Sequence, residues 1–341
     1  MYFRADADRL VFPAIISPPR GKLSASDARR ICVWCRMVFI SSSRKRASRS
    51  AGCSAGPRSA RRKRKPRRRM HRSRNAGCRK GKNRPPFAVR EVYIMYKTVH
   101  GLVLREVKFK EADKMLTVLT QEEGKLSVRA RGALRKSCRF AAASQQFAYS
   151  EMTLFLNRGR YYLEEASVVE DFRGLRDKFE ALALAAYFAE LLEAVSDEDS
   201  PDPELLRLGL NALFALSHEM FTEKQIKAAF ELRVMCISGY APALDYCAGC
   251  GKTENFRPVF SIGSGELFCS DCGEKAADGG LCIGAQTLAA MRYITGADPK
   301  RAFSFKLDEK DLRELGRVCQ RYALRQLDRG FGALDYYEKL N

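Results

Sequence analysis

The stretch KMLTVLTQEEGKLSVRAR, residues 114–131, contains two short runs of Leu, Val and Thr that are separated by Gly124. Short runs of this composition on either side of a glycine predict two β-strands. Successive side chains of a strand point to opposite faces, so Lys125, Arg129 and Arg131 share one face and the apolar residues between them share the other. The stretch therefore predicts a strand with an apolar face in a core and a cationic face outside.

Three further runs of similar composition occupy residues 99–104, 149–156 and 161–169. Five short strands in so short a segment predict a small barrel, for which a five-stranded OB-fold is the natural candidate and a small Greek-key sandwich the alternative. From Arg176 onward, apolar residues recur every three or four positions, which predicts a first helix that includes residues 179–192. Further helices are predicted over residues 201–219, 222–239, 283–295 and 308–329. The expected fold class is α+β and multidomain, an OB-fold barrel followed by an α-helical domain.

Charge divides the chain into two unlike parts. The 341 residues include 61 Lys and Arg and 40 Asp and Glu, a formal net charge of +21. Residues 1–94 hold 27 of the basic and 4 of the acidic residues, and residues 95–341 hold 34 and 36. The basicity of the whole chain is therefore no evidence about residues 95–341, which are numerous enough for one large or two smaller domains.

Residues 1–94 lack the pattern of a folded domain, because basic blocks such as residues 61–65 and 67–69 repel one another and no apolar period persists. Three interpretations are open: a basic nucleic-acid-binding tail, an organellar transit peptide, and translation of GC-rich DNA upstream of the true start. Codons permitted for residues 90–95 include a purine-rich ribosome-binding sequence ahead of an ATG. The third interpretation predicts a start at Met95 and a disordered, dispensable extension before it.

Four cysteines form the most specific local motif. Two Cys-x-x-Cys-Gly pairs are separated by eighteen residues, a spacing typical of structural zinc sites, and residues 260–268 between them predict a hairpin that returns the second pair to the first. Four thiolates complete a tetrahedron and leave no open position for a substrate. We therefore expect one structural Zn²⁺ in a module of residues 245–275, with two disulfides or four free thiols as the alternatives. The expected ligands are Cys247, Cys250, Cys269 and Cys272.

Residues 124–150 contain no Asp or Glu. They hold six basic residues: Lys125, Arg129, Arg131, Arg135, Lys136 and Arg139. Six cations without a compensating carboxylate fit a track along a phosphate backbone, and an ordinary solvated face is the alternative. Phe140, Phe147 and Tyr149 are close enough in sequence to stack on bases, or they belong to the core.

Enzyme signatures are absent from residues 95–341. The histidines there, His100 and His218, are far apart, and neither a GxSxG nor an HExxH motif occurs. Gly124 and Lys125 lack the first glycine and the Ser/Thr of a P-loop. No apolar run reaches the about 18–20 residues of a bilayer span. We expect no enzyme, no small-molecule substrate, no membrane association and a cytoplasmic location.

Several stretches share their pattern with a known bacterial family: EADKMLTVLT (111–120), EGKLSVRARG (123–132), FELR (230–233), GYAP (239–242) and the first cysteine pair. By these stretches residues 95–341 resemble the RecO family of DNA repair and recombination mediators. The resemblance implies an N-terminal OB-fold, a helical domain and a four-cysteine zinc module. It also implies binding of single- and double-stranded DNA, strand annealing, and work with RecR, the C-terminal tail of SSB and, indirectly, RecA. Family members generally lack a counterpart of residues 1–94.

The resemblance and the residues together predict a DNA repair and recombination mediator at the bacterial nucleoid. It would anneal complementary single strands and help to load the recombinase onto SSB-coated DNA; the alternative is a zinc-containing protein-interaction adaptor that does not bind DNA. The expected domains are the extension (1–94), the OB-fold DNA-binding domain (95–173) and the helical domain with its zinc module (174–341). The expected DNA contacts are Lys125, Arg129, Arg131, Arg135, Lys136, Arg139, Lys114 and Arg105.

Overall fold

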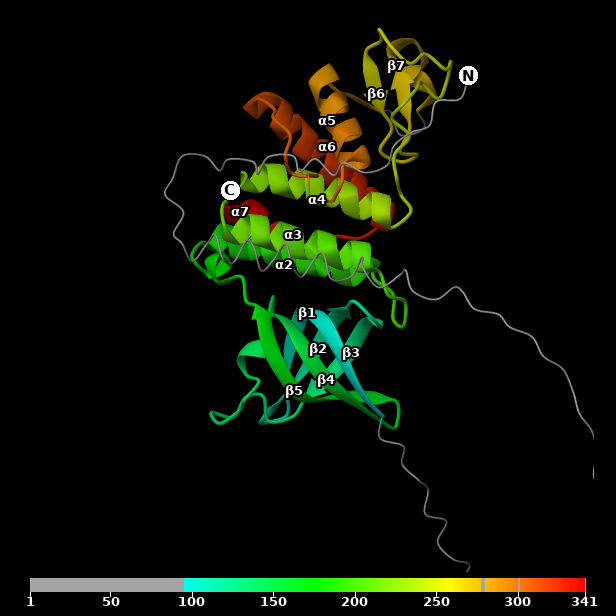
Figure 1. The fold of residues 1–341 in the computed structure, drawn as a ribbon. Coiled ribbons are helices and arrows are strands. Elements are labelled where there is room, and N and C mark those ends of the chain that lie inside the picture. The colour runs from blue at the N-terminus through cyan, green and yellow to red at the C-terminus, as the bar shows by residue number, and fades with distance from the viewer. Residues whose placement is uncertain (1–94, 277–279, 300, 341) are drawn as a thin grey trace, which may run out of the picture. The chain divides into compact units, whose positions relative to one another are not determined.

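The computed structural model describes residues 95–276, 280–299 and 301–340 (Figure 1). The predicted extension, residues 1–94, lies outside the described residues. Strands β1–β5 come first, and helices α2–α7 follow, with a small sheet between α4 and α5. Among the described helices, none is long and apolar enough to cross a membrane.

The first five strands close into a barrel in the order β1-β2-β3-β5-β4. They are β1 (Met95–Phe109), β2 (Asp113–Thr120), β3 (Gly124–Ala130), β4 (Tyr149–Asn157) and β5 (Arg160–Glu170). β1 closes the barrel because its first half pairs with β4 and its second half with β2. All neighbouring strands are antiparallel except β3 and β5, which run parallel. The five predicted strands are confirmed, and β1 extends well beyond residues 99–104 at both ends.

The barrel is filled by alternate residues of its strands. The core includes Val99, Val103, Leu116, Val118, Leu126, Val128, Met152, Leu154 and Leu163. A β-bulge between Val103 and Arg105 bends β1 at the point where its pairing passes from one neighbour to the other. Gly101 lies at this crossing, where a Cβ atom would stand only 2.4 Å from Val118 Cγ1. A side chain at this position would prevent the close approach of β1 and β2.

The helices are α2 (Phe179–Val195), α3 (Pro203–Ser217), α4 (Glu223–Ile237), α5 (Ala285–Gly296), α6 (Glu309–Leu327) and α7 (Gly332–Leu340). α4 is central, because it packs on α2, α3, α5 and α6. Its N-cap is Thr222, whose hydroxyl accepts the Gln225 N–H at 3.3 Å. Its C-terminus closes with Gly239 at φ +88° and a bond from the Tyr240 N–H to the Met235 carbonyl, a Schellman motif.

The side chain of Gln225 does not form a capping box with Thr222, because its amide donates instead to the carbonyls of Phe303 and Phe305. One helix of this region differs from the sequence prediction. α7 was not predicted, because a nine-residue helix contains too few turns to show a period. It is held by packing of Leu334 and Tyr337 in the region around α2.

Buried polar side chains connect the helices around α4. Lys227 donates to Glu231 Oε1 at 2.7 Å and to Gln320 on α6 at 2.8 Å, and the Tyr187 hydroxyl of α2 donates to the same Glu231 oxygen at 2.8 Å. The Glu231 side chain is fully buried. Burial raises the pKa of Glu231, and the neighbouring Lys227 ammonium opposes that rise.

Candidate nucleic-acid interface and metal centre

Two turns bring the four cysteines of the metal motif together. Cys247 and Cys250 lie in the loop after α4, where Gly251 has a φ of +77° and donates its N–H to the Cys247 carbonyl at 2.7 Å. The predicted hairpin is present as β6 (Pro258–Phe260) and β7 (Leu267–Cys269), with β8 (Leu281–Cys282) paired to the other edge of β6. It places Cys269 at the end of β7 and Cys272 in the following turn.

The four sulfur atoms have the spacing of a metal site. Their Sγ atoms all lie within 4.8 Å of one another, and the four thiols are free. The Sγ atoms of Cys250 and Cys269 are 3.7 Å apart. In a tetrahedral site with Zn–S distances of about 2.3 Å, two sulfurs lie about 3.8 Å apart, whereas a disulfide bond is about 2.05 Å long. The cluster could therefore hold one metal ion, and the structure has no disulfide among these four residues.

Backbone N–H groups prepare Cys247 to be a thiolate ligand. Burial by itself raises the pKa of this thiol, but hydrogen bonds from the backbone of Cys269, Cys250 and Gly249 outweigh burial and lower the pKa to about 6. The Cys269 nitrogen lies 3.2 Å from the Cys247 sulfur. The hydrogen bond with Cys269, followed by burial, raises the pKa of Cys272 to about 12. A bound cation would stabilise all four thiolates together.

β3 has the two faces that the sequence predicts. Leu126, Val128 and Ala130 are buried in the barrel, and Lys125 and Arg129 lie on its outside. The expectation that these cations lack a carboxylate is wrong for Arg129, because β2 supplies one from outside residues 124–150.

That carboxylate is Asp113. Arg129 donates to its Oδ2 from Nη2 at 2.7 Å and from Nε at 3.1 Å, and the Arg129 guanidinium lies 4.9 Å from the centre of the Phe109 ring. The N–H of Gly132 donates to the other Asp113 oxygen at 2.9 Å. The hydrogen bond from the Gly132 N–H is the largest cause that lowers the pKa of Asp113 below its usual value, and the bond from Arg129 is the next largest.

Three more of the expected DNA contacts also have partners within the protein. Lys125 Nζ donates to the carbonyl of Glu193 at 2.9 Å, and Arg105 pairs with the carboxylate of the same residue at 2.7 Å. Lys114 pairs with Glu106 at 2.7 Å. Lys125 and Arg105 therefore tie the barrel to the C-terminal end of α2.

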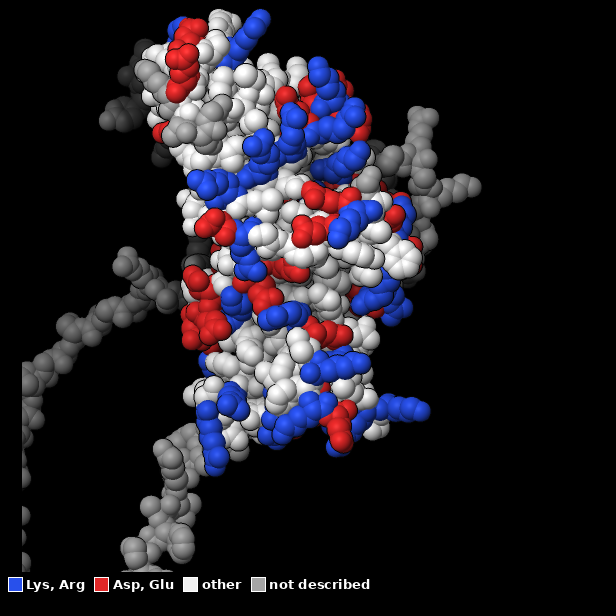
Figure 2. Space-filling model, turned by 180° about the vertical axis from the view of Figure 1, so that it is seen from behind, with Lys and Arg blue, Asp and Glu red and all other residues white. Residues whose placement is uncertain are grey.

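The other four cations are exposed: Arg131, Arg135, Lys136 and Arg139. Within the described residues, none of them has a carboxylate within ion-pair distance, 4.0 Å. Arg131 follows β3. The other three lie in a loop that starts at Gly132, whose φ is +68°, and that is anchored by a bond from the Leu134 N–H to the Ala112 carbonyl at 3.0 Å. We call Arg135, Lys136 and Arg139 the basic loop. Figure 2 shows Lys and Arg side chains over the barrel with few Asp or Glu beside them.

Sequence reasoning missed a row of three aromatic rings, of which the last, Tyr162, is buried and covered by Arg131. Tyr96 on β1 is paired in register with Phe155 on β4, and Phe155 with Tyr162 on β5. The ring centres of the first pair are 6.1 Å apart and those of the second 5.0 Å, and Arg131 lies 4.3 Å above the Tyr162 ring. We call Tyr96, Phe155 and Tyr162 the aromatic ladder. Only the strand register joins these distant residues, so no local sequence signal marks them.

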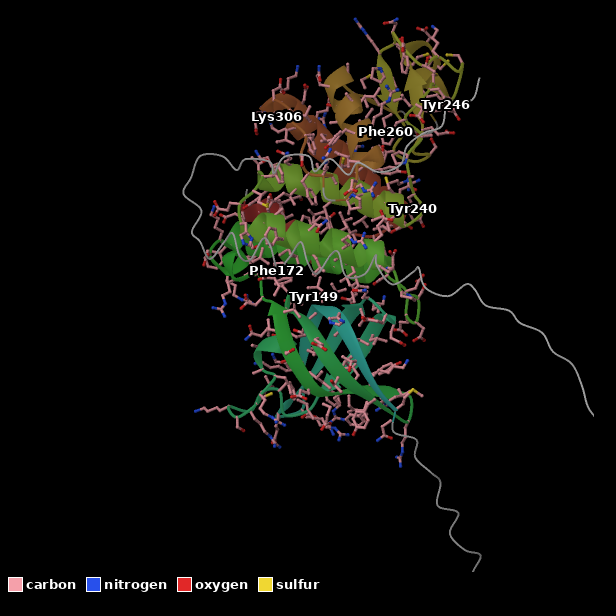
Figure 3. All side chains as sticks on the ribbon, in the orientation of Figure 1. Tyr149, Phe172, Tyr240, Tyr246, Phe260 and Lys306 are labelled. Carbon is pink, nitrogen blue, oxygen red and sulfur yellow. The ribbon has the colours of Figure 1, made fainter. Side chains whose placement is uncertain are left out.

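The aromatic residues proposed from the sequence are placed less favourably. Phe147 is buried, and Phe140 packs against the barrel core. Tyr149 lies at the end of the barrel that faces the helices, near Phe172 (Figure 3), and burial raises its pKa to about 12. These rings belong mainly to the core, the alternative that the sequence left open.

Comparison with known proteins accounts for both parts of the described chain. The family model of the recombination protein O N terminal matches residues 95–172, and that of its C terminal matches residues 176–335. The DNA repair protein RecO of Acetivibrio thermocellus is 34% identical over 246 residues, which are 72% of this chain and 98% of that protein. The chain belongs to the RecO family. RecO of Symbiobacterium thermophilum is 31% identical over 245 residues, 71% of this chain and 96% of that protein. The resemblance seen in the sequence is confirmed, and the residues that the two family models match all lie after residue 94.

Proposed function

We propose that this RecO-family protein acts in DNA repair and homologous recombination by holding single strands of DNA on its barrel. The observation that carries the proposal is that Arg131, one of four exposed cations without a carboxylate partner among the described residues, covers a ring of the aromatic ladder. Its guanidinium lies over the Tyr162 ring at 4.3 Å. Cations that follow a backbone, next to rings on which bases stack, are the general design of single-strand binding surfaces.

The strand order supports assigning the barrel to the OB-fold class. A five-stranded OB-fold binds oligonucleotides on the face of strands 2 and 3 and with the loops between strands 1 and 2 and between strands 4 and 5. Here β2 and β3 carry Arg129 and lead to Arg131, and the turn at Arg158 and Gly159 joins β4 to β5 next to Phe155. The exposed cations and the ladder thus lie around the surface that such a barrel uses. We propose residues 95–173 as the DNA-binding domain and residues 174–341 as the helical domain.

The eight expected DNA contacts divide by their partners. We propose that Arg131 and the basic loop contact phosphates, because no carboxylate of the described residues competes for them. We assign Arg105, Lys114, Lys125 and Arg129 chiefly to holding the barrel, because each already has a partner within the protein.

Annealing follows from such a surface without any chemical step. Base pairing supplies the free energy, and the protein has only to lower the repulsion between two phosphate backbones and keep their bases accessible. We propose that the chain anneals single strands in this way, and that with RecR and the C-terminal tail of SSB it helps to load RecA onto SSB-coated DNA at the nucleoid. The thiolate donor set and the 3.7 Å sulfur spacing support Zn²⁺ as the metal of the cysteine module, in a structural role.

Salt-dependent binding of labelled oligonucleotides tests the proposal. Residues 95–341 are a suitable test protein, because the RecO family models match residues 95–172 and 176–335. Replacing the basic loop, R135A/K136A/R139A, should flatten the plot of log affinity against log salt by about 2, from about 0.7 for each lost contact with a single strand. Replacing Tyr96 and Phe155 by Leu should weaken binding by about 1–3 kcal/mol per stacked base and leave the salt slope unchanged.

A matched control removes the same charge from the helical domain and the cysteine module. Lys252, Arg257 and Arg301 are exposed there, and the variant K252A/R257A/R301A should keep the parental slope. Equal slopes for the folded basic-loop variant and this control would contradict the proposal. Failure of residues 95–341 to bind DNA would instead favour a protein-interaction adaptor.

A further inference from the structure

α6 presents a row of four arginines on its outer face. Arg313, Arg317, Arg321 and Arg325 follow one another at intervals of four residues, and all four are exposed. The opposite face of the helix is buried and includes Leu312, Leu315, Val318, Cys319, Tyr322 and Ala323. Packing on α4 and α5 therefore fixes the orientation of the helix. We call these four residues the α6 arginine row. Figure 2 shows a band of Lys and Arg side chains across the helical region.

The row is not explained by ion pairs within the described part of the chain. Arg313 has Glu309 at 3.9 Å, and that carboxylate is shared with Lys224 at 2.9 Å. No described carboxylate lies within ion-pair distance, 4.0 Å, of Arg317, Arg321 or Arg325. The neighbouring Glu314 is directed to the other side of the helix, where it accepts from Gly284 N at 2.7 Å and from the Thr287 hydroxyl.

The row is also not explained by the stability of the helix. Equal charges four residues apart repel each other and destabilise a helix, and this row contains three such pairs in succession. The favourable interaction of a cation with the helix dipole is confined to the last turn, where only Arg325 lies. Gly316, within the row, has no atom near the position of a Cβ, and glycine in the middle of a helix is itself unfavourable. The residues on the outer face of α6 therefore lower the stability of the helix.

The pattern fits a polymer with a regularly repeated negative charge. Successive arginines advance by about 6 Å along the axis, so the row extends over about 18 Å, a length that spans about five phosphates of one strand of a duplex. Guanidinium groups bind phosphate oxygens through two parallel hydrogen bonds. None of the large exposed apolar side chains of the described residues lies on α6. The row thus lacks the apolar or aromatic anchors on which peptide binding depends, and it lacks a ring for base stacking.

We propose that the α6 arginine row is a second DNA site, which binds the phosphate backbone of one DNA segment independently of the barrel. Because the row makes no contact with bases, it accepts a duplex as well as a single strand and does not select a sequence. The barrel packs on α2 and α3, whereas α6 packs on α4 and α5, so helices separate the two surfaces (Figure 1). One molecule can then hold two DNA segments at the same time. The inference concerns α6 alone and does not require the barrel to bind DNA.

The first experiment measures binding of a labelled duplex by the variant R317A/R321A/R325A, against the charge-matched control K252A/R257A/R301A. Each variant is made in the full chain and in residues 95–341, so that the 27 basic residues before Met95 contribute equally to variant and control. Three lost phosphate contacts should flatten the salt slope by about 2.7, from about 0.9 each on a duplex. Helix content and the urea midpoint should be at least as high as in the parent, because exposed alanines replace repelling arginines. Coincident slopes for variant and control would overturn the proposal.

The second experiment measures energy transfer between two non-complementary oligonucleotides that carry different dyes. The parent and the control should bring the two together, whereas the α6 variant should still bind one oligonucleotide and give no transfer. If the basic-loop variant behaves as the parent while the α6 variant binds neither oligonucleotide, DNA binding by the barrel is refuted and DNA binding by the α6 arginine row is supported. If energy transfer in the α6 variant equals that of the parent, DNA binding by the α6 arginine row is refuted and the proposed function of the barrel is unaffected. Loss of poly-glutamate binding by the α6 variant, with its DNA slope unchanged, would assign the row to an acidic protein partner and also overturn it.

Discussion

Replacing Lys227 by Met should destabilise the protein by about 3–5 kcal/mol near neutral pH, the usual effect of removing one member of a buried ion pair. Glu231 is fully buried, and Lys227 Nζ lies 2.7 Å from its Oε1. Without the ammonium, only the Tyr187 hydroxyl still stabilises the carboxylate, and the second oxygen, Oε2, has no hydrogen-bond partner even in the parent. Gln320 Oε1 also loses its donor.

The loss of stability in the Lys227 variant should become smaller as pH falls. Burial already raises the pKa of Glu231, and Lys227 opposes that rise, so the variant should have a still higher pKa. A group whose pKa is higher in the folded than in the unfolded state stabilises the fold fully below its unfolded pKa, and this contribution is lost as pH rises through the folded pKa. The variant should therefore regain stability as pH falls, by up to about 1.4 kcal/mol per pH unit between those two pKa values.

Urea unfolding of residues 95–341 at a series of pH values from neutral down to the ordinary pKa of Glu measures both effects. The control is K227M/E231Q, in which the glutamine keeps an acceptor for Tyr187 and has no proton to gain. It should be more stable than K227M at neutral pH and lack the added pH dependence. A K227M variant within about 1 kcal/mol of the parent, well below the 3–5 kcal/mol of a broken buried pair, or with the parent's pH profile, would refute the reasoning.

Three further outcomes are expected. Replacing Cys250 by Ser should abolish stoichiometric metal binding and loosen the β6–β7 hairpin, since the free energy of a structural metal is folding free energy; metal analysis and amide exchange check this, and full metal content in the variant would exclude Cys250 as a ligand. Gly101→Ala should destabilise the barrel by about 1–3 kcal/mol through overpacking, because its Cβ would lie 2.4 Å from Val118; a urea midpoint equal to the parent's would contradict this. In the parent, ionised Asp113 contributes to the free energy of unfolding above the ordinary Asp pKa, and this contribution is lost as pH falls through the lowered pKa of Asp113. Asp113→Asn should therefore lower the free energy of unfolding at neutral pH and make it fall less steeply in acid. Identical acid-unfolding curves for variant and parent would show that the Asp113–Arg129 pair does not contribute.

The sequence by itself determined the features that depend on local periodicity and spacing. Alternation along β3 put Leu126 and Val128 in the core and Arg129 outside, because side chains of a strand point alternately to its two faces. The cysteine pairs predicted the metal cluster, because a Cys-x-x-Cys turn brings two thiols together and a hairpin of the intervening residues returns the second pair. Thr222 and Gly239 marked the ends of α4 through hydrogen bonds that reach only a few residues along the chain.

Only the tertiary structure decided which charges and rings meet. The acid-free segment around Arg129 predicted an unpaired cation, but strand pairing places Asp113, sixteen residues earlier, at 2.7 Å. The aromatic ladder likewise exists because β1 and β5 both pair with β4, and sequence spacing alone does not specify that register. The arginines of α6 form a four-residue repeat in the sequence. That Arg317, Arg321 and Arg325 have no carboxylate partner among the described residues depends on how α4 and α5 pack on that helix. The reason is the same throughout: spacing along the chain determines local geometry, whereas an ion pair or a stacked ring depends on atoms that distant segments bring within a few ångströms.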